Sequence, residues 1–373
     1  MMEMKYTKLK CINQYKNKSI NPAKTPDTVF EMYSVPIYET GHPEYLRGNE
    51  IASNKVIVEK NDILLCKINP RINRVWVVAD ESDKQNIASS EWIVIRNSEY
   101  NAEFLAWYFR SFRFQKLMTS EVTGIGGSLT RAQPKCVAEY PVPVLDRKKQ
   151  NEIVEILNKC KFIIDSRKRE LVELDNLIKA RFVEMFGDPV VNEKGWMTKP
   201  LLDMGQCKNG MNFHYDDKGI EINCLGVGDF KNLSVIDNTE ELPTVSLNEM
   251  PSEEYLLKDD DIVFVRSNGN KALVGRSLAV YPGDVPTTFS GFCIRYRKYD
   301  NEIIVPYLLR VLKTDSMRVK MAGRGANIQN LNQQILGTLV IPVPPIELQE
   351  QFANFVKQVD KSKVTKQIDS HIS

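Results

Sequence analysis

One pattern occurs twice in this chain. The prolines of Pro141–Pro143 end an apolar run and lead through charged residues to Gln150, where a helical pattern begins, and Pro342–Pro344 lead to Gln351 in the same way. Residues 141 and 342, and residues 150 and 351, are both 201 positions apart. A repeated segment of this length is typical of a duplicated structural unit. The chain is therefore predicted to contain two copies of a β-rich domain, each followed by a long helix.

The segments before the prolines correspond in the same order. Each half has an acidic turn leading into an apolar strand, then a second strand, a short amphipathic helix and a glycine-rich loop. The corresponding pairs are Asn61–Lys67 with Asp260–Arg266, Ser90–Arg96 with Ser290–Tyr296, Phe104–Phe109 with Pro306–Leu312, and Gly124–Arg131 with Gly323–Asn330. A shared order over most of the chain favours duplication over chance similarity of short motifs. We expect an α+β protein with two globular domains, long antiparallel helices and a pseudo-twofold internal repeat.

Composition sets the class of protein. With 373 residues, 42% of them hydrophobic and 26% charged, the chain has room for two or three globular domains. No apolar segment approaches the roughly 20 residues that span a bilayer, and the first residues lack the apolar core of a signal peptide, so a cytoplasmic protein is expected. The seven cysteines are scattered and form no CxxC pair, which predicts neither a disulfide framework nor a zinc site.

A long helix is predicted between the two domains. Asp146 suits the N-cap position, and Gly187 with Pro189 just beyond it suits the C-terminal end. About 40 residues at about 1.5 Å each give a helix of about 60 Å, close to two turns of B-DNA. These signals divide the chain into a first domain of residues 1–145, a spacer helix of residues 146–187, a second domain of residues 188–345 and a short C-terminal helix of residues 346–373.

Basic and amide side chains gather in one turn after a strand in each half, and again in the glycine-rich loops. The net charge is only +2, so local clustering is the informative quantity. Arg and Asn can pair with guanine and adenine edges, whereas Lys, Ser and glycine amides suit phosphates. A single turn of this kind is usually just solvated, but its recurrence favours a DNA surface. The candidate DNA-binding residues are Lys67, Asn69, Arg71, Asn73, Arg74, Ser128, Thr130 and Arg131 in the first half, and Arg266, Ser267, Asn268, Asn270, Lys271, Arg276, Arg324, Asn327, Gln329 and Asn330 in the second.

The spacer helix carries an apolar stripe that needs a partner. Its natural partner is the C-terminal helix, but the helical pattern there weakens after Val364, which leaves about 20 to 25 residues, or about 30 to 38 Å, for pairing. The distal part of the stripe is therefore expected to lack an intramolecular partner and to bind another protein. Its residues are Leu171, Leu174, Leu177, Ile178 and Phe182.

Together these features resemble the specificity subunits of Type I restriction-modification systems. The resemblance is carried by Pro141–Pro143 and Pro342–Pro345, by the glutamines at 150 and 351, by residues 171–189 with their Phe-Gly-Asp-Pro ending, and by residues 69–76. It implies two target recognition domains that each read one half of a split double-stranded DNA sequence, with antiparallel helices fixing the gap. It also implies two methyltransferase subunits docked on the helices, and motor-nuclease subunits that join for restriction. The chain itself is then non-catalytic and binds no cofactor, because S-adenosylmethionine and ATP belong to the partner subunits.

Two alternatives remain open. Asn69-Pro70-Arg71 partly matches the Asn-Pro-Pro-aromatic signature of adenine methyltransferases, but the second proline and the aromatic residue are missing, and the chain contains no P-loop. The three histidines, at 42, 214 and 371, have no partners at metal-ligand spacing. A stand-alone DNA-binding or coiled-coil scaffold protein would fit the same repeat. Co-purification with a large methyltransferase would distinguish that alternative.

Overall fold

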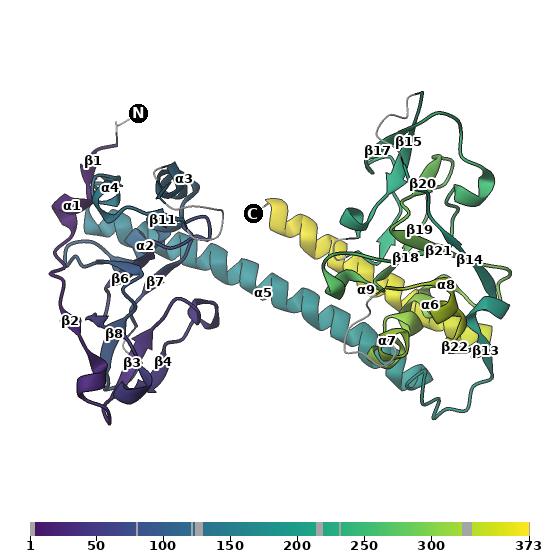
Figure 1. Cartoon of the computed structure of the whole chain (residues 1–373), viewed down its shortest axis with the longest axis horizontal. Helices are drawn as coiled ribbons and strands as arrows, with labels where there is room; N and C mark the ends of the chain where they lie inside the picture. Colours follow the sequence, from purple (N-terminus) through teal and green to yellow (C-terminus); the bar gives the residue numbers. More distant parts are fainter. Residues whose placement is uncertain are drawn as a thin grey trace. The chain divides into compact units, whose positions relative to one another are not determined.

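The computed structural model describes residues 4–79, 81–120, 122–123, 130–213, 219–230, 233–322 and 330–372. The chain forms two compact units, Met1–Asp165 (unit 1) and Ser166–Ser373 (unit 2), whose boundary falls inside the helix α5 (Arg147–Phe186). Each unit contains small sheets, short helices and a segment of long helix (Figure 1). The predicted α+β class with two domains is confirmed.

Unit 1 is built on two sheets. One is antiparallel with the order β7-β6-β9, and the other has the order β2-β5-β8-β3-β4. The strands are β2 (Ser19–Ile20), β3 (Val29–Tyr33), β4 (Glu44–Arg47), β5 (Lys55–Ile57), β6 (Ile63–Cys66), β7 (Val75–Val77), β8 (Gln85–Ala88) and β9 (Trp92–Ile95), with the separate pairs β1 (Tyr6–Lys8)·β12 (Pro141–Pro143) and β10 (Val122–Thr123)·β11 (Arg131–Ala132). The helices before α5 are α1 (Leu9–Ile12), α2 (Ala102–Arg110), α3 (Phe112–Ser120) and α4 (Pro134–Val137).

Unit 2 repeats this plan with different strand lengths. Its larger sheet has the order β14-β21-β18-β19-β16, its smaller sheet the order β17-β15-β20, and β13 pairs with β22. The strands are β13 (Thr198–Pro200), β14 (Gly205–Asn209), β15 (Ile220–Leu225), β16 (Val235–Ile236), β17 (Thr244–Leu247), β18 (Asp261–Val265), β19 (Ser277–Val280), β20 (Thr287–Phe289), β21 (Cys293–Lys298) and β22 (Val340–Pro342). The helices are α6 (Val305–Leu312), α7 (Asp315–Ala322), α8 (Gln333–Gly337) and α9 (Ile346–Ile372).

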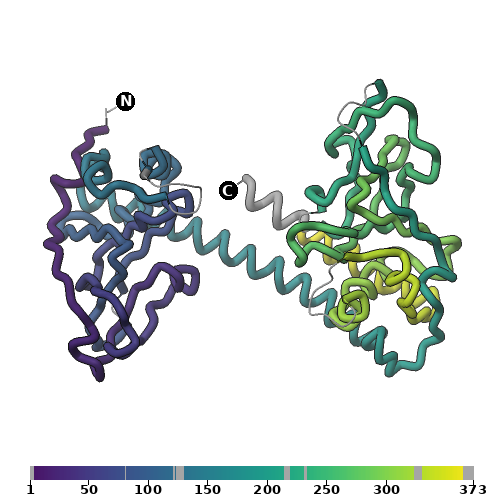
Figure 2. The backbone as a smooth tube through the Cα atoms, viewed as in Figure 1, coloured from purple at the N-terminus to yellow at the C-terminus, as the bar shows by residue number. Residues whose placement is uncertain are grey.

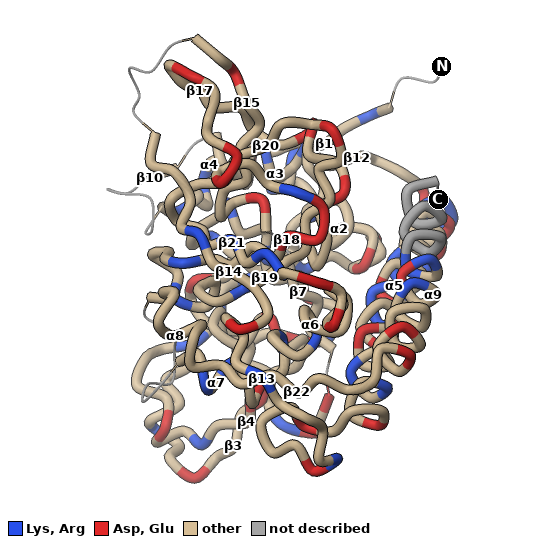
Figure 3. The backbone as a smooth tube through the Cα atoms, turned by 90° about the vertical axis from the view of Figure 1, so that its right-hand side faces the viewer, with Lys and Arg blue, Asp and Glu red and all other residues tan. Residues whose placement is uncertain are grey.

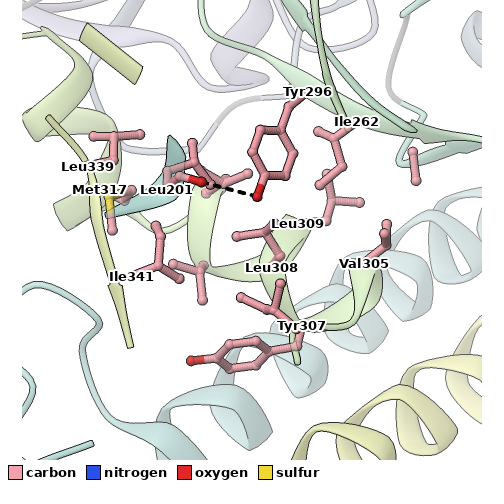
Figure 4. Close-up of a cluster of buried hydrophobic side chains, with 14 of the residues drawn as sticks. Leu201, Ile262, Tyr296, Val305, Tyr307, Leu308, Leu309, Met317, Leu339 and Ile341 are labelled. Atoms are coloured by element: carbon pink, nitrogen blue, oxygen red, sulfur yellow. Dashed lines mark hydrogen bonds between the residues drawn. The ribbon is translucent and has the colours of Figure 1, made fainter. Parts of the chain in front are cut away.

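The central strand of each unit lies between two cores. Every residue of β18 is buried, and successive side chains of a strand point to opposite faces. Ile262 and Phe264 therefore join the core under α6, while Val263 and Val265 join the core under the smaller sheet. Figure 4 shows the first of these cores, where the hydroxyl of Tyr296 donates a hydrogen bond to a backbone carbonyl at 3.2 Å. In the same way, the strand β6 of unit 1 contributes Ile63 and Leu65 to one core and Leu64 and Cys66 to another.

The two units also repeat an ion pair that holds the central strand. Asp62 is 1% exposed and receives hydrogen bonds from both Nε and Nη2 of Arg96 at 2.7 Å. Asp261 is fully buried and receives the same fork from Arg297 at 2.8 and 2.7 Å. The hydrogen bond to Asp62 raises the pKa of the Arg96 guanidinium. A paired fork is the geometry that lets a carboxylate remain buried.

The hydrogen bonds correct the register of the repeat. The last strand ends at Pro143 in unit 1 and at Pro342 in unit 2. The buried glutamine after it is Gln150 in unit 1 and Gln349 in unit 2, because these two make equivalent hydrogen bonds. Gln351 is exposed. The true separation is therefore 199 residues (349 − 150), and the prediction that pairs Gln150 with Gln351 is wrong by two positions.

The second half of α5 and α9 are antiparallel neighbours. Phe352 of α9 lies against Phe182 and Phe186 of α5, with ring centroids 5.5 and 5.7 Å apart. Farther along, Lys363 of α9 bonds to Asp175 of α5 at 2.7 Å. Residue numbers thus fall along α5 as they rise along α9. Figure 2 shows α5 as one uninterrupted helix of the backbone.

This pairing corrects the expectation that the distal stripe of α5 lacks an intramolecular partner. Phe182 is 1% and Ile178 is 7% exposed, and Leu174 packs against the same core. Leu171 is half-buried, and only Leu177, at 48%, faces outward. The expectation failed because it took the partner from beyond Val364, whereas α9 runs antiparallel to α5 and covers the stripe with residues near its own start, such as Phe352. Charged residues of both signs run along α5 and α9 (Figure 3), and the described helices include none that could span a bilayer.

Candidate nucleic-acid interface

The first candidate turn lies between β6 and β7 and is fixed by main-chain bonds. The backbone N–H of Asn69 donates to the carbonyl of Thr130 at 2.8 Å, and that of Ala132 donates to the carbonyl of Lys67 at 2.8 Å. Asn69 has a φ of 46°, a left-handed conformation that asparagine tolerates better than most residues. Thr130 is buried, so it supports the turn from behind and offers no surface hydroxyl.

The helices α2 and α3 clamp this turn. Nδ2 of Asn73 donates to the carbonyl of Arg110 at 2.8 Å, and Nη2 of Arg110 donates to the carbonyl of Val75 at 2.6 Å. From α3, Nε2 of Gln115 donates to the carbonyl of Pro70. The amide of Asn73, a predicted DNA-binding group, is therefore already engaged within the unit.

The cations of this turn differ in their surroundings. Arg71 is exposed, whereas Arg74 is half-buried beside Cys66, and burial raises the pKa of that thiol. Nζ of Lys67 donates to a backbone carbonyl at 2.6 Å. Arg131 is exposed and forms an ion pair with Glu91 at 3.3 Å. Arg71 is thus the cation of this turn that most plainly faces solvent.

The second candidate turn follows β18, and Arg266 makes there the two main-chain hydrogen bonds that Lys67 makes in unit 1, where the Lys67 N–H donates to the carbonyl of Glu91 at 3.0 Å and the Lys67 carbonyl accepts from Ala132. The N–H of Arg266 donates to the carbonyl of Phe292 at 2.8 Å, and the N–H of Leu331 donates to the carbonyl of Arg266 at 2.9 Å. The side chains of two asparagines also hold the loop. Oδ1 of Asn268 accepts a hydrogen bond from the backbone N–H of Asn270 at 2.8 Å, and Oδ1 of Asn270 accepts one from the backbone N–H of Ala272 at 3.1 Å. Such side-chain turns are the ordinary use of asparagine in loops.

A helix also clamps the second turn. Arg318 of α7 donates to the carbonyls of Gly275 and Val274 at 3.2 and 3.4 Å. Burial lowers the pKa of the Arg318 guanidinium. The two units thus hold their candidate turns with arginines from different helices, Arg110 in α2 and Arg318 in α7.

The remaining predicted residues fall into three groups. Asn270, Lys271 and Asn330 are exposed, and Arg266, Ser267, Asn268 and Arg276 are half-buried around the second turn. Ser128, Arg324, Asn327 and Gln329 lie outside the described residues. Within each unit, the described candidate residues lie in or beside one turn after the central strand, and the role of each side chain in DNA contact stays a prediction.

One surface residue escapes the sequence reasoning. Phe292 is 62% exposed at the turn before β21, next to Arg266, whose Nη1 donates to the carbonyl of Gly291 at 3.4 Å. A Cβ on Gly291 would lie 2.1 Å from Oδ1 of Asn212, so any other residue here would require the Asn212 side chain to move. The sequence contained a hint of this exposed ring, because Phe292 directly follows the turn-forming pair Ser290-Gly291. The comparison of the two halves instead assigned residues 290–296 to a strand, whereas β21 begins only at Cys293.

The described residues contain no group of three or more His, Cys, Asp or Glu side chains placed to hold a metal ion. A polar cleft of about 560 Å³ in unit 1 is lined by Lys60, Arg96 and Arg147 among others, but by no residue of the candidate turn.

Comparison with known proteins finds similarity to one family. Residues 193–373 match the Type I restriction modification DNA specificity domain. The chain is 24% identical over 277 residues to the StySPI specificity subunit of Salmonella potsdam, a match that spans 69% of this chain and 58% of the Salmonella subunit. It is 21% identical over 376 residues to the MjaVIII specificity subunit of Methanocaldococcus jannaschii, covering 92% of this chain and 83% of that subunit.

Solved structures share the fold. A chain from a study of complex assembly and conformational transition of the type I R-M system has a TM-score of 0.60 at 15% identity, and the match covers 100% of this chain and 93% of the other. The Type I restriction-modification S subunit from M. genitalium has a TM-score of 0.54 at 14% identity, with coverage of 99% and 92%. The second part of this chain thus matches the Type I restriction modification DNA specificity domain, and the chain is similar over most of its length to specificity subunits of Type I restriction-modification systems.

Proposed function

We propose that the chain reads a split double-stranded DNA sequence, one half with each unit, and positions methyltransferase subunits on it. The observation that supports this proposal most directly is that both units contain the same kind of turn at the same place in the fold. A basic and asparagine-rich turn follows the buried central strand in both units and is tied down by equivalent main-chain bonds. Rigid placement of polar groups is what sequence reading requires, because a misplaced donor cannot select a base.

Within each turn we assign different work to different side chains. Exposed Arg71 and Lys271 are assigned to DNA contact, whereas engaged groups such as Asn73 and Asn270 hold the turns in shape. Loss of a bidentate base contact should cost about 1 to 3 kcal/mol and relax one half-site, and loss of a phosphate contact should weaken all sequences alike.

Partner subunits have a surface to cover on α5. Ile156, Phe162, Ile163, Ile164 and Val172 are between 48% and 67% exposed. Exposed apolar side chains concentrated in one segment mark an interaction site. At about 100° per residue these side chains point in different directions around the helix, so we assign the exposed middle segment of α5, and no single face of it, to the methyltransferase subunits, in place of the buried stripe around Ile178. S-adenosylmethionine and ATP would then be bound by methyltransferase and motor-nuclease partners in the cytoplasm, and this chain would be a non-catalytic subunit.

Mapping of methylated adenines in the host genome tests the proposal. The expected result is a recurrent split motif with one modified adenine in each half, which disappears when the chain is deleted. Exchange of the residues of one turn should then alter one half of the motif only. A methylome unchanged by deletion, together with purification of the chain free of any methyltransferase, would overturn the proposal and favour the scaffold alternative.

A further inference from the structure

A buried glutamine lies in the first turn of α5. Gln150 is 2% exposed, and both ends of its amide are bonded. Oε1 accepts a hydrogen bond from the backbone N–H of Asn101 at 2.7 Å, and Nε2 donates to the carbonyl of Leu145 at 2.8 Å. Asn101 is the N-cap of α2, and Leu145 lies between β12 and α5. One side chain thus joins the last strand, the short helix and the long helix of unit 1.

Unit 2 builds the same junction at α9. Gln349 is fully buried, its Oε1 accepts from the N–H of Ile304 at 3.0 Å, and its Nε2 donates to the carbonyls of Pro344 and Glu302 at 2.8 and 3.1 Å. Ile304 is the N-cap of α6. The recurrence is independent of the sequence around it, since the residues bonded differ in type between the two units.

The partners dictate that the side chain be an amide. A backbone N–H can only donate and a carbonyl can only accept, so the orientation of each amide is fixed by its neighbours. Glutamate would turn a carboxylate oxygen toward the carbonyl of Leu145 or Pro344. Methionine would leave a buried N–H and a buried carbonyl without partners, which is costly.

The junction of unit 1 is connected directly to the candidate DNA turn. The helix α2 begins at Ala102, directly after its N-cap Asn101, and ends at Arg110, nine residues and about 13 Å. At the C-terminal end of α2, the guanidinium of Arg110 donates a hydrogen bond to the carbonyl of Val75, and the carbonyl of Arg110 accepts one from the side-chain amide of Asn73. The other polar bonds between α2 and α5, such as the 2.9 Å bond from Trp107 to Asn158, are exposed to water and hold less firmly.

We propose that Gln150 and Gln349 are positioning residues that lock each long helix to the short helix of its own unit and so fix the direction in which the long helix leaves the DNA-facing turn. We call this connection between the long and the short helix the lock, and its existence rests only on the hydrogen bonds of Gln150 and Gln349 described above. Its consequence rests on the proposed function, since a helix of fixed direction would set which gap between two half-sites is accepted.

Two exposed cysteines allow a direct measurement within unit 1. Cys11 lies in α1 and Cys160 lies in α5, ten residues after Gln150. We would attach spin labels to both in the full chain, with half-buried Cys136 and Cys207 replaced by serine, and measure the distance distribution by double electron–electron resonance. Ten residues place Cys160 about 15 Å beyond the lock, so a tilt of about 10° to 20° moves it by about 3 to 5 Å.

Gln150→Glu and Gln150→Met should both broaden or shift this distribution by that amount. Gln14→Met is the matched control, because Gln14 is an exposed glutamine of unit 1 whose side chain bonds only to Ser98 in the described contacts, and it should leave the distribution unchanged. An unchanged distribution in a folded Gln150→Met would overturn the lock. Loss of far-ultraviolet circular dichroism in both variants would also overturn it, since the residue would then serve folding alone.

The functional arm separates this inference from the proposed function. In cells carrying the complete system, Gln150→Met should leave both half-sequences intact and add sites whose gap differs by a base pair. Absence of a split motif with the unaltered chain would refute the proposed function and leave the distance measurement to decide the lock. A split motif whose gap selectivity is the same in Gln150→Met would refute the consequence drawn here.

Discussion

Replacement of Phe182 by alanine should destabilise unit 2 selectively. The ring is 1% exposed and contacts Phe186, Tyr307 and Phe352, with centroid distances between 5.3 and 5.8 Å. Truncation of a buried phenylalanine costs about 3 to 5 kcal/mol, because transfer energy is lost and a cavity remains. With a urea dependence of about 2 kcal/mol per M, the unfolding midpoint should fall by about 1.5 to 2.5 M.

Fluorotryptophan resonances can report each unit separately. Trp196, whose Nε1 donates to the carbonyl of Phe186 at 3.0 Å, is the reporter in unit 2, and the other three tryptophans, at 76, 92 and 107, lie in unit 1. The ¹⁹F signal of Trp196 should show the lowered midpoint while the other three keep theirs. Unit-specific probes avoid the assumption that the whole chain unfolds in one step.

A neighbouring residue provides the control. Val183 follows Phe182 on α5 but is 56% exposed, so Val183→Ala should move the Trp196 midpoint very little. The reasoning would be refuted if both substitutions had equal effects, since alanine favours the helix at both positions and the loss would then not depend on burial in the aromatic core. It would also be refuted if the tryptophans of unit 1 moved together with Trp196.

Four further outcomes follow from the described contacts. Arg295→Met should stabilise unit 2 by about 1 to 4 kcal/mol, because the Arg295 guanidinium is 2% exposed and its Nε and Nη1 have no hydrogen-bond partners. The urea midpoint for unfolding of unit 2, followed by the Trp196 signal, measures this change, and a lowered midpoint would disprove the explanation. Burial beside Arg310 lowers the pKa of Lys313 to about 8 from 10.5. The charged lysine therefore opposes folding at lower pH, and stability should rise between pH 8 and 10.5 in the unaltered chain but less in Lys313→Met, as urea titrations on either side of that window would show. Phe162→Asp should weaken binding of the methyltransferase subunit to the chain without changing the unfolding midpoint of unit 1. Undiminished binding would exclude the exposed middle segment of α5 from the docking surface. Arg71→Ala should lower DNA affinity in a binding titration while leaving stability unchanged, and equal affinity would show that the exposed arginine does not touch DNA.

Local signals in the sequence were sufficient for the ends of α5. Oδ1 of Asp146 accepts from the N–H of Lys149 at 2.8 Å, and Gly187 has the left-handed φ of 77° expected of a C-terminal glycine. Both signals act within one helical turn, so the sequence contains all of the relevant partners. The order of the repeated elements was accessible for the same reason.

The register of the repeat and the partner of the stripe depended on contacts far apart in the chain. Prolines punctuate the repeat without making its bonds, and the residues that distinguish Gln349 from Gln351 are Ile304 and Glu302, more than 40 positions away. In the same way, nothing near Asn73 in the sequence reveals that its amide binds the carbonyl of Arg110. Recurrence located the candidate surface, but only three-dimensional contacts separate its supporting groups from its exposed ones.

The sharing of α5 between both units has a consequence for synthesis. Phe182 leaves the ribosome 170 residues before Phe352, its partner in α9 (352 − 182). At about 5 to 20 residues per second, the apolar face that includes Ile178 and Phe182 waits about 9 to 34 s for its cover. Unit 1 can close its cores during that interval, because they draw on no residue beyond Val154. The nascent chain therefore passes through a stage in which one folded unit carries a bare helix, and a chaperone that binds amphipathic helices would find its substrate there.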